Sequence, residues 1–288
     1  MTISQTLKFA IAKLTASDIT DLPHLEAEIL LSAILKKPRE FLLAHGEKKL
    51  SKKQINNYLK LLARRLKGEP VAYLTGHKEF YGLDFIVNKN VLIPRPETEL
   101  MVDEALNILK HNQQHATLID VGTGSGCVII TLAKISKSKA NNFIGIDISA
   151  KALTIAKKNA YAHGAKNIKF LHGNLLEPIT KIRNQKFIIL ANLPYGWKAW
   201  KNNSSADTIG LKFEPEIALY TGKNGLELYE ELFKQIKALQ IAGYALCEFD
   251  PRQTVKMKQL IKRKLPRANC QIKKDLAGLN RLVIIEVA

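Results

Sequence analysis

The chain has 288 residues, of which 46% are hydrophobic, so it is long enough to bury a sizeable core and to form two domains. No run of apolar residues approaches the roughly 18 that a membrane span needs, and the N-terminal stretch lacks the apolar core of a secretory signal. The three cysteines lie far apart without metal-ligand spacing. This pattern predicts reduced thiols, no metal site and a cytoplasmic location.

The formal net charge is +18 at pH 7, which is compatible with a nucleic-acid partner. The excess consists mostly of lysines scattered along the chain rather than arginines clustered with aromatic residues. The charge therefore leaves direct nucleic-acid binding open without requiring it, and it raises solubility in either case.

Residues 1–72 are predicted to form a helical domain that recognises a substrate. Apolar residues recur at helical spacing between residues 22 and 37, at Leu22, Leu25, Ile29, Leu30 and Ala33. A second helix is expected over residues 51–68, where Ser51 and Gln54 fit a capping box and Gly68 is a stop signal. No set of side chains in this domain indicates chemistry, so we expect it to pack and to bind a partner.

Residues 73–95 are predicted to form a β-hairpin that links two domains. The segment mixes aromatic and β-branched residues with glycine, and it contains an Asn-Lys-Asn turn at residues 88–90. A helix is expected to begin directly after it, with Pro96 near the first turn and Glu97 and Glu99 at the positive end.

Residues 96–288 are predicted to form an α/β domain, because apolar strands alternate with amphipathic helices after residue 115. Strands are expected at residues 116–122, 142–148, 167–173, 186–192, 243–249 and 281–287. This alternation is typical of a mostly parallel sheet with helices on both faces, in which ligands bind at the carboxyl ends of the strands. Gly122, Asp147, Asn174 and Asn192 each fall at or just after such an end.

A glycine-rich segment, residues 120–126, joins the first of these strands to a helix and is called the glycine loop below. Glycines let a backbone approach a ligand closely, and the helix N-terminus supplies amide donors. The spacing is G-x-G-x-G, with Cys127 where a dinucleotide fingerprint has its third glycine. Taken alone, the loop is compatible with a dinucleotide site, a methyl-donor site or a turn without a ligand.

Two further features favour a methyl donor. Asp147 ends the next strand and is well placed to accept hydrogen bonds from both hydroxyls of a ribose, which NAD sites also require. The sequence Asn192, Leu193, Pro194 and Tyr195, called the Asn-Leu-Pro-Tyr motif below, follows the fourth strand. Together with the glycine loop led by Asp120, these features resemble the class I amino-methyltransferases that depend on S-adenosylmethionine (SAM).

The Asn-Leu-Pro-Tyr motif fits a clamp for a planar NH2 group. Methyl transfer is an in-line displacement, so an enzyme mainly positions the nucleophile. Asn192 Oδ1 and the Leu193 carbonyl can accept from the two N–H bonds, and Pro194 keeps that carbonyl aimed. Tyr195 can stack on the flat face of the substrate. The alternative is an ordinary turn that ends a strand.

Nearly the whole chain resembles the peptide chain release factor glutamine N(5)-methyltransferases, the HemK/PrmC family. The resemblance is carried by residues 69–100, 120–133, 213–229 and 273–286, and the Pro-Arg-Pro-Glu-Thr-Glu segment at 94–99 is its most specific part. It implies an α/β fold of the class I SAM-dependent methyltransferases, Rossmann-like with a mostly parallel seven-stranded sheet, preceded by a small helical domain. It also implies methylation of the glutamine amide in the Gly-Gly-Gln motif of class 1 release factors. We expect a monomer, although the sequence leaves the oligomeric state open.

The resemblance also implies roles for individual residues. Cofactor binding falls to Gly122, Thr123, Gly124, Ser125, Gly126, Asp147, Asn174, Leu175 and Asn192. In this scheme the glycine loop holds the methionine and ribose, Asp147 binds the ribose hydroxyls and Leu175 flanks the adenine. The four residues of the Asn-Leu-Pro-Tyr motif are both the catalytic and the substrate-binding residues.

The chain departs from the family pattern at three places near this site. Leu193 replaces a usual Pro, Asn174 stands where an Asp is usual, and residues 186–192 lack an acidic residue that is common there. The resulting Asn-Leu-Pro-Tyr is familiar from ribosomal RNA adenine dimethyltransferases, although those lack the segment at 94–99 and the N-terminal helices. Two alternatives therefore stay open: an adenine N-methyltransferase that acts on RNA or DNA, and a degenerate SAM-binding scaffold.

Overall fold

The computed structural model describes residues 1–111, 116–136, 142–179, 186–197 and 206–287. The chain divides into two compact units. The first, the helical unit, comprises Met1–His77 with Asn202–Glu214, and the second, the sheet unit, comprises Lys78–Lys201 with Pro215–Ala288. The boundaries expected after residues 72 and 95 stay predictions.

The helical unit contains five helices, α1 (Ile3–Thr15), α2 (Pro23–Leu35), α3 (Arg39–Ala44), α4 (Lys52–Arg65) and α5 (Val71–Thr75). They enclose a core of leucine, isoleucine and alanine side chains around the fully buried Tyr58 ring. Ser51 caps α4 and Gln54 returns the bond, as the capping box predicts. Arg65 forms a part-buried ion pair with Glu26 of α2, with 2.7 Å between Nε and Oε2.

The buried face of α2 differs from the one that helical spacing predicts. Ala27, Leu30 and Leu31 are fully buried, whereas Leu22 is 58% exposed and Ala33 is also exposed. Helix α2 contacts α1, α3, α4 and α5, so it is covered on several sides. Its apolar residues are too many for periodicity alone to identify the face with the densest packing.

A 3-10 helix, η3 (Ala206–Phe213), belongs to the helical unit although it follows the sheet strand β6 in the chain. It lies against the end of α4, because a Cβ atom on Gly68 would come within 2.5 Å of Ile209 Cγ2. Gly68 has a φ of +94°, so a glycine there both ends the helix and allows η3 to approach. No sequence signal predicts this association.

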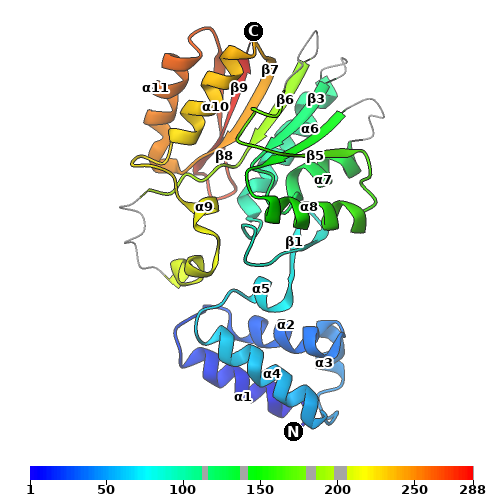
Figure 1. Ribbon diagram of the computed structural model, residues 1–288. Helices are drawn as coiled ribbons and strands as arrows, with labels where there is room; N and C mark the ends of the chain where they lie inside the picture. The colour runs from blue at the N-terminus through cyan, green and yellow to red at the C-terminus, as the bar shows by residue number, and fades with distance from the viewer. Residues whose placement is uncertain (112–115, 137–141, 180–185, 198–205, 288) are drawn as a thin grey trace. The chain divides into compact units, whose positions relative to one another are not determined.

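The sheet unit is built on seven strands, β3 (Ala116–Val121), β4 (Asn142–Asp147), β5 (Ile168–His172), β6 (Lys186–Ala191), β7 (Ala242–Glu248), β8 (Asn269–Lys274) and β9 (Asn280–Val287). The order is β5-β4-β3-β6-β7-β9-β8, with β3 to β7 parallel and β9 antiparallel to both of its neighbours (Figure 1). The predicted fold class, a mostly parallel seven-stranded sheet, is confirmed. Strand β8 is the one strand of this sheet that the sequence patterns do not predict.

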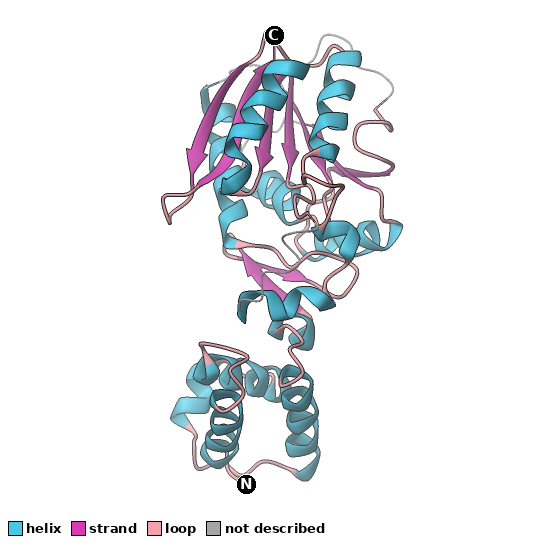
Figure 2. Ribbon diagram, turned by 90° about the vertical axis from the view of Figure 1, so that its left-hand side faces the viewer, coloured by secondary structure: helices cyan, strands magenta, loops and turns pink. Residues whose placement is uncertain are grey.

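Helices cover both faces of the sheet (Figure 2). The helices α10 (Glu227–Ala238) and α11 (Thr254–Lys264) pack on one face, and α6 (Glu99–His111), α7 (Cys127–Ile135) and α8 (Ala150–Ala162) pack on the other. Among the described residues, three short helices complete the unit, η1 (Pro96–Thr98), α9 (Glu216–Leu219) and η4 (Pro251–Gln253). Successive residues of β3 enter opposite cores, Leu118 with α6 and α7 and Ile119 with α10 and α11.

The predicted hairpin segment contains two short strands, β1 (His77–Phe80) and β2 (Leu83–Ile86). Its turn is Tyr81-Gly82, where both φ values are positive, and not the Asn-Lys-Asn sequence, which follows β2. Two-residue hairpins favour this turn geometry because its twist matches the strands. The first three residues of the predicted segment instead complete α5, which ends at Gly76.

Within the described ranges, no helix combines the length and the apolar character that crossing a membrane requires. The described residues also contain no group of three or more His, Cys, Asp or Glu placed to hold a metal ion.

Candidate functional site

The predicted site residues all lie at or after the carboxyl ends of four neighbouring parallel strands. The glycine loop follows β3, Asp147 ends β4, Asn174 and Leu175 follow β5, and the Asn-Leu-Pro-Tyr motif follows β6. The strand order β5-β4-β3-β6 therefore brings all of them to one edge of the sheet.

The backbone of the glycine loop is held by the neighbouring strand. The amides of Gly122 and Thr123 both donate to the Ile146 carbonyl, at 2.8 and 2.9 Å. Gly124 adopts a φ of +55°, and a Cβ atom built on it would meet nothing closer than 3.9 Å. The backbone thus turns into a conformation that favours glycine, and an added Cβ atom would make only an ordinary contact with the Gly122 carbonyl.

Asp120 and Thr123 form a buried pair at the start of the loop. Thr123 Oγ1 donates to Asp120 Oδ2 at 2.6 Å. Asp120 is only 4% exposed. Burial, reinforced by the nearby Asp147 charge, raises the pKa of Asp120 to about 7. Burial also raises the pKa of the adjacent Cys127 thiol to about 12, so this cysteine is not an activated nucleophile.

Asp147 connects the glycine loop to the end of β4. Its Oδ2 accepts the Gly124 amide at 2.9 Å and its Oδ1 accepts the Ser149 amide at 2.8 Å. Burial raises the pKa of this carboxyl, and the two backbone amides offset part of that rise. Each carboxylate oxygen has lone pairs for about two hydrogen bonds, so both oxygens retain capacity for another donor.

The two predicted residues after β5 make local contacts. Leu175 has a φ of +53° and is 6% exposed, with its side chain in the core that also contains Ile146 and Leu193. Asn174 Nδ2 donates to Glu177 Oε1 at 3.0 Å. The roles assigned to this pair at a cofactor stay predictions.

Asn192 and Leu193 present two unused acceptors. Asn192 Nδ2 donates to Thr98 Oγ1 at 2.9 Å, whereas no described residue donates to Asn192 Oδ1 or to the Leu193 carbonyl. The Leu193 side chain packs beside the glycine loop, since a Cβ atom on Gly122 would lie 3.1 Å from Leu193 Cδ2. The Leu193 amide donates to the Tyr229 hydroxyl at 3.1 Å.

Tyr195 is held at both its side chain and its backbone. Its hydroxyl donates to Glu248 Oε1 at 3.2 Å, and its carbonyl accepts from Gln253 Nε2 at 3.0 Å. Burial raises the pKa of Tyr195, so the phenol stays protonated and acts as a donor.

Four residues hold the Asn-Leu-Pro-Tyr motif by hydrogen bonds that the sequence does not predict: Thr98, Tyr229, Glu248 and Gln253. Thr98 lies in the segment 94–99 that carries the resemblance, but no pattern assigns it a contact. Glu248 is the last residue of β7. The rule that singles out Asp147, an acidic residue at the end of a parallel strand, would have found it.

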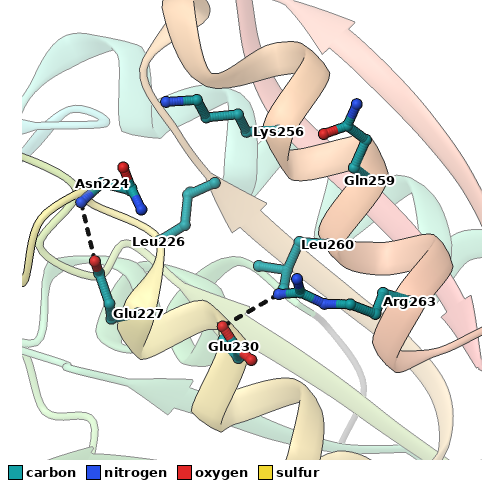
Figure 3. A pocket seen from close by; sticks show the side chains of 8 residues that line it. All are labelled: Asn224, Leu226, Glu227, Glu230, Lys256, Gln259, Leu260 and Arg263. Carbon is teal, nitrogen blue, oxygen red and sulfur yellow. Dashed lines mark hydrogen bonds and ion pairs between the residues drawn. The ribbon is translucent and has the colours of Figure 1, made fainter.

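A surface pocket of about 200 Å³ lies between α10 and α11 (Figure 3). Its walls include Glu230 and Arg263, which are 3.2 Å apart in an ion pair, and Glu227, which accepts the Asn224 amide. None of the predicted site residues lines it. Its paired charges are those of a solvated groove between helices, and the site at the strand ends stays a prediction.

The fold and the polar strand ends define a methyltransferase domain of the Rossmann-like, doubly wound class. The family model described as a methyltransferase domain matches residues 112–237, and the one described as the PrmC N-terminal domain matches residues 5–76. The solved hMettl16 catalytic domain, in complex with a MAT2A 3'UTR hairpin, has the same fold, with a TM-score of 0.57 over 82% of each chain at 15% identity.

The curated relatives give the family. The release factor glutamine methyltransferase of Aliivibrio fischeri is 34% identical over 99% of this chain and 97% of its own. The bifunctional methyltransferase of Rickettsia typhi is 37% identical over 90% of this chain but only 52% of its own, so the chain spans about half the length of that relative. The chain belongs to the release factor glutamine methyltransferase family.

Proposed function

We propose that this chain uses SAM to methylate the side-chain amide nitrogen of the glutamine in the Gly-Gly-Gln motif of class 1 release factors. One observation carries the proposal. Asn192 Oδ1 and the Leu193 carbonyl accept from no described residue, while the Asn192 amide nitrogen is engaged by Thr98. Two adjacent free acceptors at a strand end match the two N–H bonds of a primary amide. The names of the full-length relatives support release factors as the substrate.

The residues at the strand ends fit SAM. The space beside Gly124 would admit the methionine part, and the start of α7 supplies amide donors for its carboxylate. The spare lone pairs of the Asp147 carboxylate would accept from the two ribose hydroxyls. In this arrangement Leu175 borders the adenine, and Asn174 Oδ1 is available as an acceptor because its Nδ2 is engaged by Glu177.

Bound SAM would supply an electrophilic methyl group on sulfur. The chain's own part is to orient a weak nucleophile, because the lone pair of an amide nitrogen is delocalised into its carbonyl. Acceptance of both N–H bonds by Asn192 and Leu193 would raise the electron density on that nitrogen and fix its position. On accepting the methyl group, the amide nitrogen would release one proton to solvent. Pro194 would keep the Leu193 carbonyl aimed, and the Tyr195 ring would cover the planar amide.

The test combines the purified full chain with SAM and an unmethylated class 1 release factor, read out by mass spectrometry of the peptide that contains Gly-Gly-Gln. We expect one added methyl group on the glutamine, and we expect Asn192→Ala to reduce the rate by about 100-fold or more. Binding of S-adenosylhomocysteine, measured by calorimetry, should persist in that variant.

Each alternative has its own outcome in the same assay. Methyl transfer to RNA or DNA adenine, with none to the release factor, would replace the proposed substrate by a nucleic acid. Tight cofactor binding without transfer to any substrate would identify a scaffold instead of an enzyme. The monomeric state and the cytoplasmic location expected from the sequence stay predictions.

A further inference from the structure

One buried carboxylate is linked to both polar ends of the Asn-Leu-Pro-Tyr motif, directly to Tyr195 and through Thr98 to Asn192. Glu248 Oε2 accepts from Thr98 Oγ1 at 2.7 Å, and Thr98 Oγ1 in turn accepts from Asn192 Nδ2 at 2.9 Å. Glu248 Oε1 accepts from the Tyr195 hydroxyl at 3.2 Å. Thr98 is 3% exposed and Glu248 is 2% exposed, so water does not compete for these bonds.

The chemistry of these groups gives the hydrogen-bond chain one direction. An ionised carboxylate only accepts, so the single proton of the Thr98 hydroxyl must point to Glu248. The hydroxyl oxygen then offers only lone pairs to Asn192, which has to turn its NH2 toward Thr98. Asn192 Oδ1 is thereby left facing away from Thr98 as an acceptor.

Without the Glu248 carboxylate, the proton of the Thr98 hydroxyl would no longer be held toward residue 248. The Thr98 hydroxyl could then rotate and donate to Asn192 Oδ1, which would flip the side-chain amide by half a turn. A flipped Asn192 presents N–H groups to the N–H bonds of a substrate amide, and two donors repel each other.

We propose that Glu248 and Thr98 are positioning residues that set the amide orientation of Asn192, and that Glu248 also anchors Tyr195. The proposal rests on the proposed function, because it explains how the Asn192 acceptor is kept available for a substrate amide. Neither residue touches the substrate in this scheme. The two side chains act through Asn192 and Tyr195, from η1 and from the end of β7.

The decisive variant is Thr98→Val, which keeps the shape of the side chain and removes only the hydroxyl. Steady-state methylation of a release factor at pH 8 should show kcat lowered by about tenfold or more, with KM for the release factor changed by less than about threefold. Glu248→Leu, which removes both oxygens that accept from Thr98 and Tyr195, should behave in the same way. Thr98→Ser, which restores the hydroxyl, should recover kcat to within about threefold of the parent chain.

Thr131→Val is the matched control. Thr131 lies in α7, is fully buried, and its hydroxyl has no hydrogen-bond partner among the described residues. The same atoms are removed from a threonine outside the site, so kcat and KM should stay unchanged. A fall in kcat for Thr98→Val no larger than that for Thr131→Val, or a failure of Thr98→Ser to recover it, would overturn the proposal.

A second measurement separates this proposal from the proposed function. In protein labelled with 15N-asparagine, the side-chain NH2 of Asn192 should give a slowly exchanging NMR signal that disappears in Thr98→Val and persists in Thr131→Val. This signal does not depend on any substrate. Absence of release factor methylation by the parent chain with a protected Asn192 signal would reject the function alone, whereas methylation with an unprotected signal would reject the positioning role alone.

Discussion

Leu193 takes part in the site through its backbone and packs through its side chain. Its carbonyl is one of the two proposed acceptors, its amide donates to the Tyr229 hydroxyl, and its side chain is 4% exposed beside the glycine loop. The Tyr229 hydroxyl in turn lies within hydrogen-bond distance of the Ala191 and Glu248 carbonyls. A hydrogen bond to α10 thus holds the turn where the family usually has the rigid ring of a proline.

Leu193→Pro should consequently separate activity from stability. The variant keeps the carbonyl, so we expect kcat for release factor methylation to stay within about threefold of the parent chain. It loses the bond to Tyr229 and part of a buried side chain, which should lower the free energy of unfolding by about 2 kcal/mol. Urea unfolding and the methylation assay check the two parts, and a loss of activity comparable to Asn192→Ala would contradict the role given to the carbonyl.

The sequence predicts the residues that lie at the strand ends, because parallel strands bring their carboxyl ends to one edge whatever the loops contain. It cannot predict the partners of those residues. Thr98 lies 94 positions before Asn192 and 150 positions before Glu248 in the chain. Only the folded sheet unit brings these three side chains together, so the support of the motif becomes visible with the structure.

At the scale of elements, the sequence does not predict strand β8 and misplaces the turn of the hairpin. Strand β8 has mostly polar residues, and it forms because β9 offers it a hydrogen-bonding partner at the edge of the sheet. The hairpin is predicted but its turn is displaced, since Tyr81 takes a positive φ that favours Gly or Asn. Long apolar strands such as β3 and β6 are predicted correctly because both of their faces are buried.

The loop before α10 constrains the Asn-Leu-Pro-Tyr motif through Gly225. This residue has a φ of +75°, and a Cβ atom there would collide with the Tyr195 carbonyl and with Gln253 Nε2. Gly225→Ala should therefore displace Tyr195 and lower both the free energy of unfolding and kcat. Gly164→Ala is the matched control, because Gly164 has a φ of +68° and open space around its Cβ position.

The two glycine variants differ in the collisions of the added methyl group, which meets the Tyr195 carbonyl and Gln253 only in Gly225→Ala. Both carry the strain of alanine in the left-handed region, about 1–2 kcal/mol, which thermal unfolding should reveal. The methylation rate should fall only in Gly225→Ala. Equal rates in the two variants would show that the loop before α10 does not position Tyr195.

At the scale of the whole molecule, the site places three buried carboxyls at the strand ends. Burial raises the pKa of Asp120 to about 7 and also raises the pKa of Asp147 and of Glu248. In the unfolded chain such groups ionise near pH 4. Between about pH 4 and pH 7 the folded chain therefore binds more protons than the unfolded chain, and these groups stabilise it less as the pH rises.

Carboxyls with lowered pKa values make the folded chain more stable as the pH rises, but they do so in a lower pH range. Burial raises the pKa of Asp250 and of Asp275, yet hydrogen bonds from Arg252, from Arg281 and from backbone amides outweigh it and lower both values. Their stabilising contribution is complete above about pH 4 and is lost only below it. The pH dependence between 4 and 7 should then be dominated by the three site carboxyls.

We therefore expect the free energy of unfolding to be greater near pH 5 than near pH 8, by about 1 kcal/mol or more. Asp120→Asn replaces the carboxyl whose pKa burial raises to about 7 by a neutral amide that still accepts from Thr123. The variant should flatten the profile between pH 5 and pH 7 and gain stability at pH 8 relative to the parent chain. Urea unfolding of both proteins across this range provides the measurement. A stability that rises with pH over this window in the parent chain would mean that the site carboxyls remain ionised when buried.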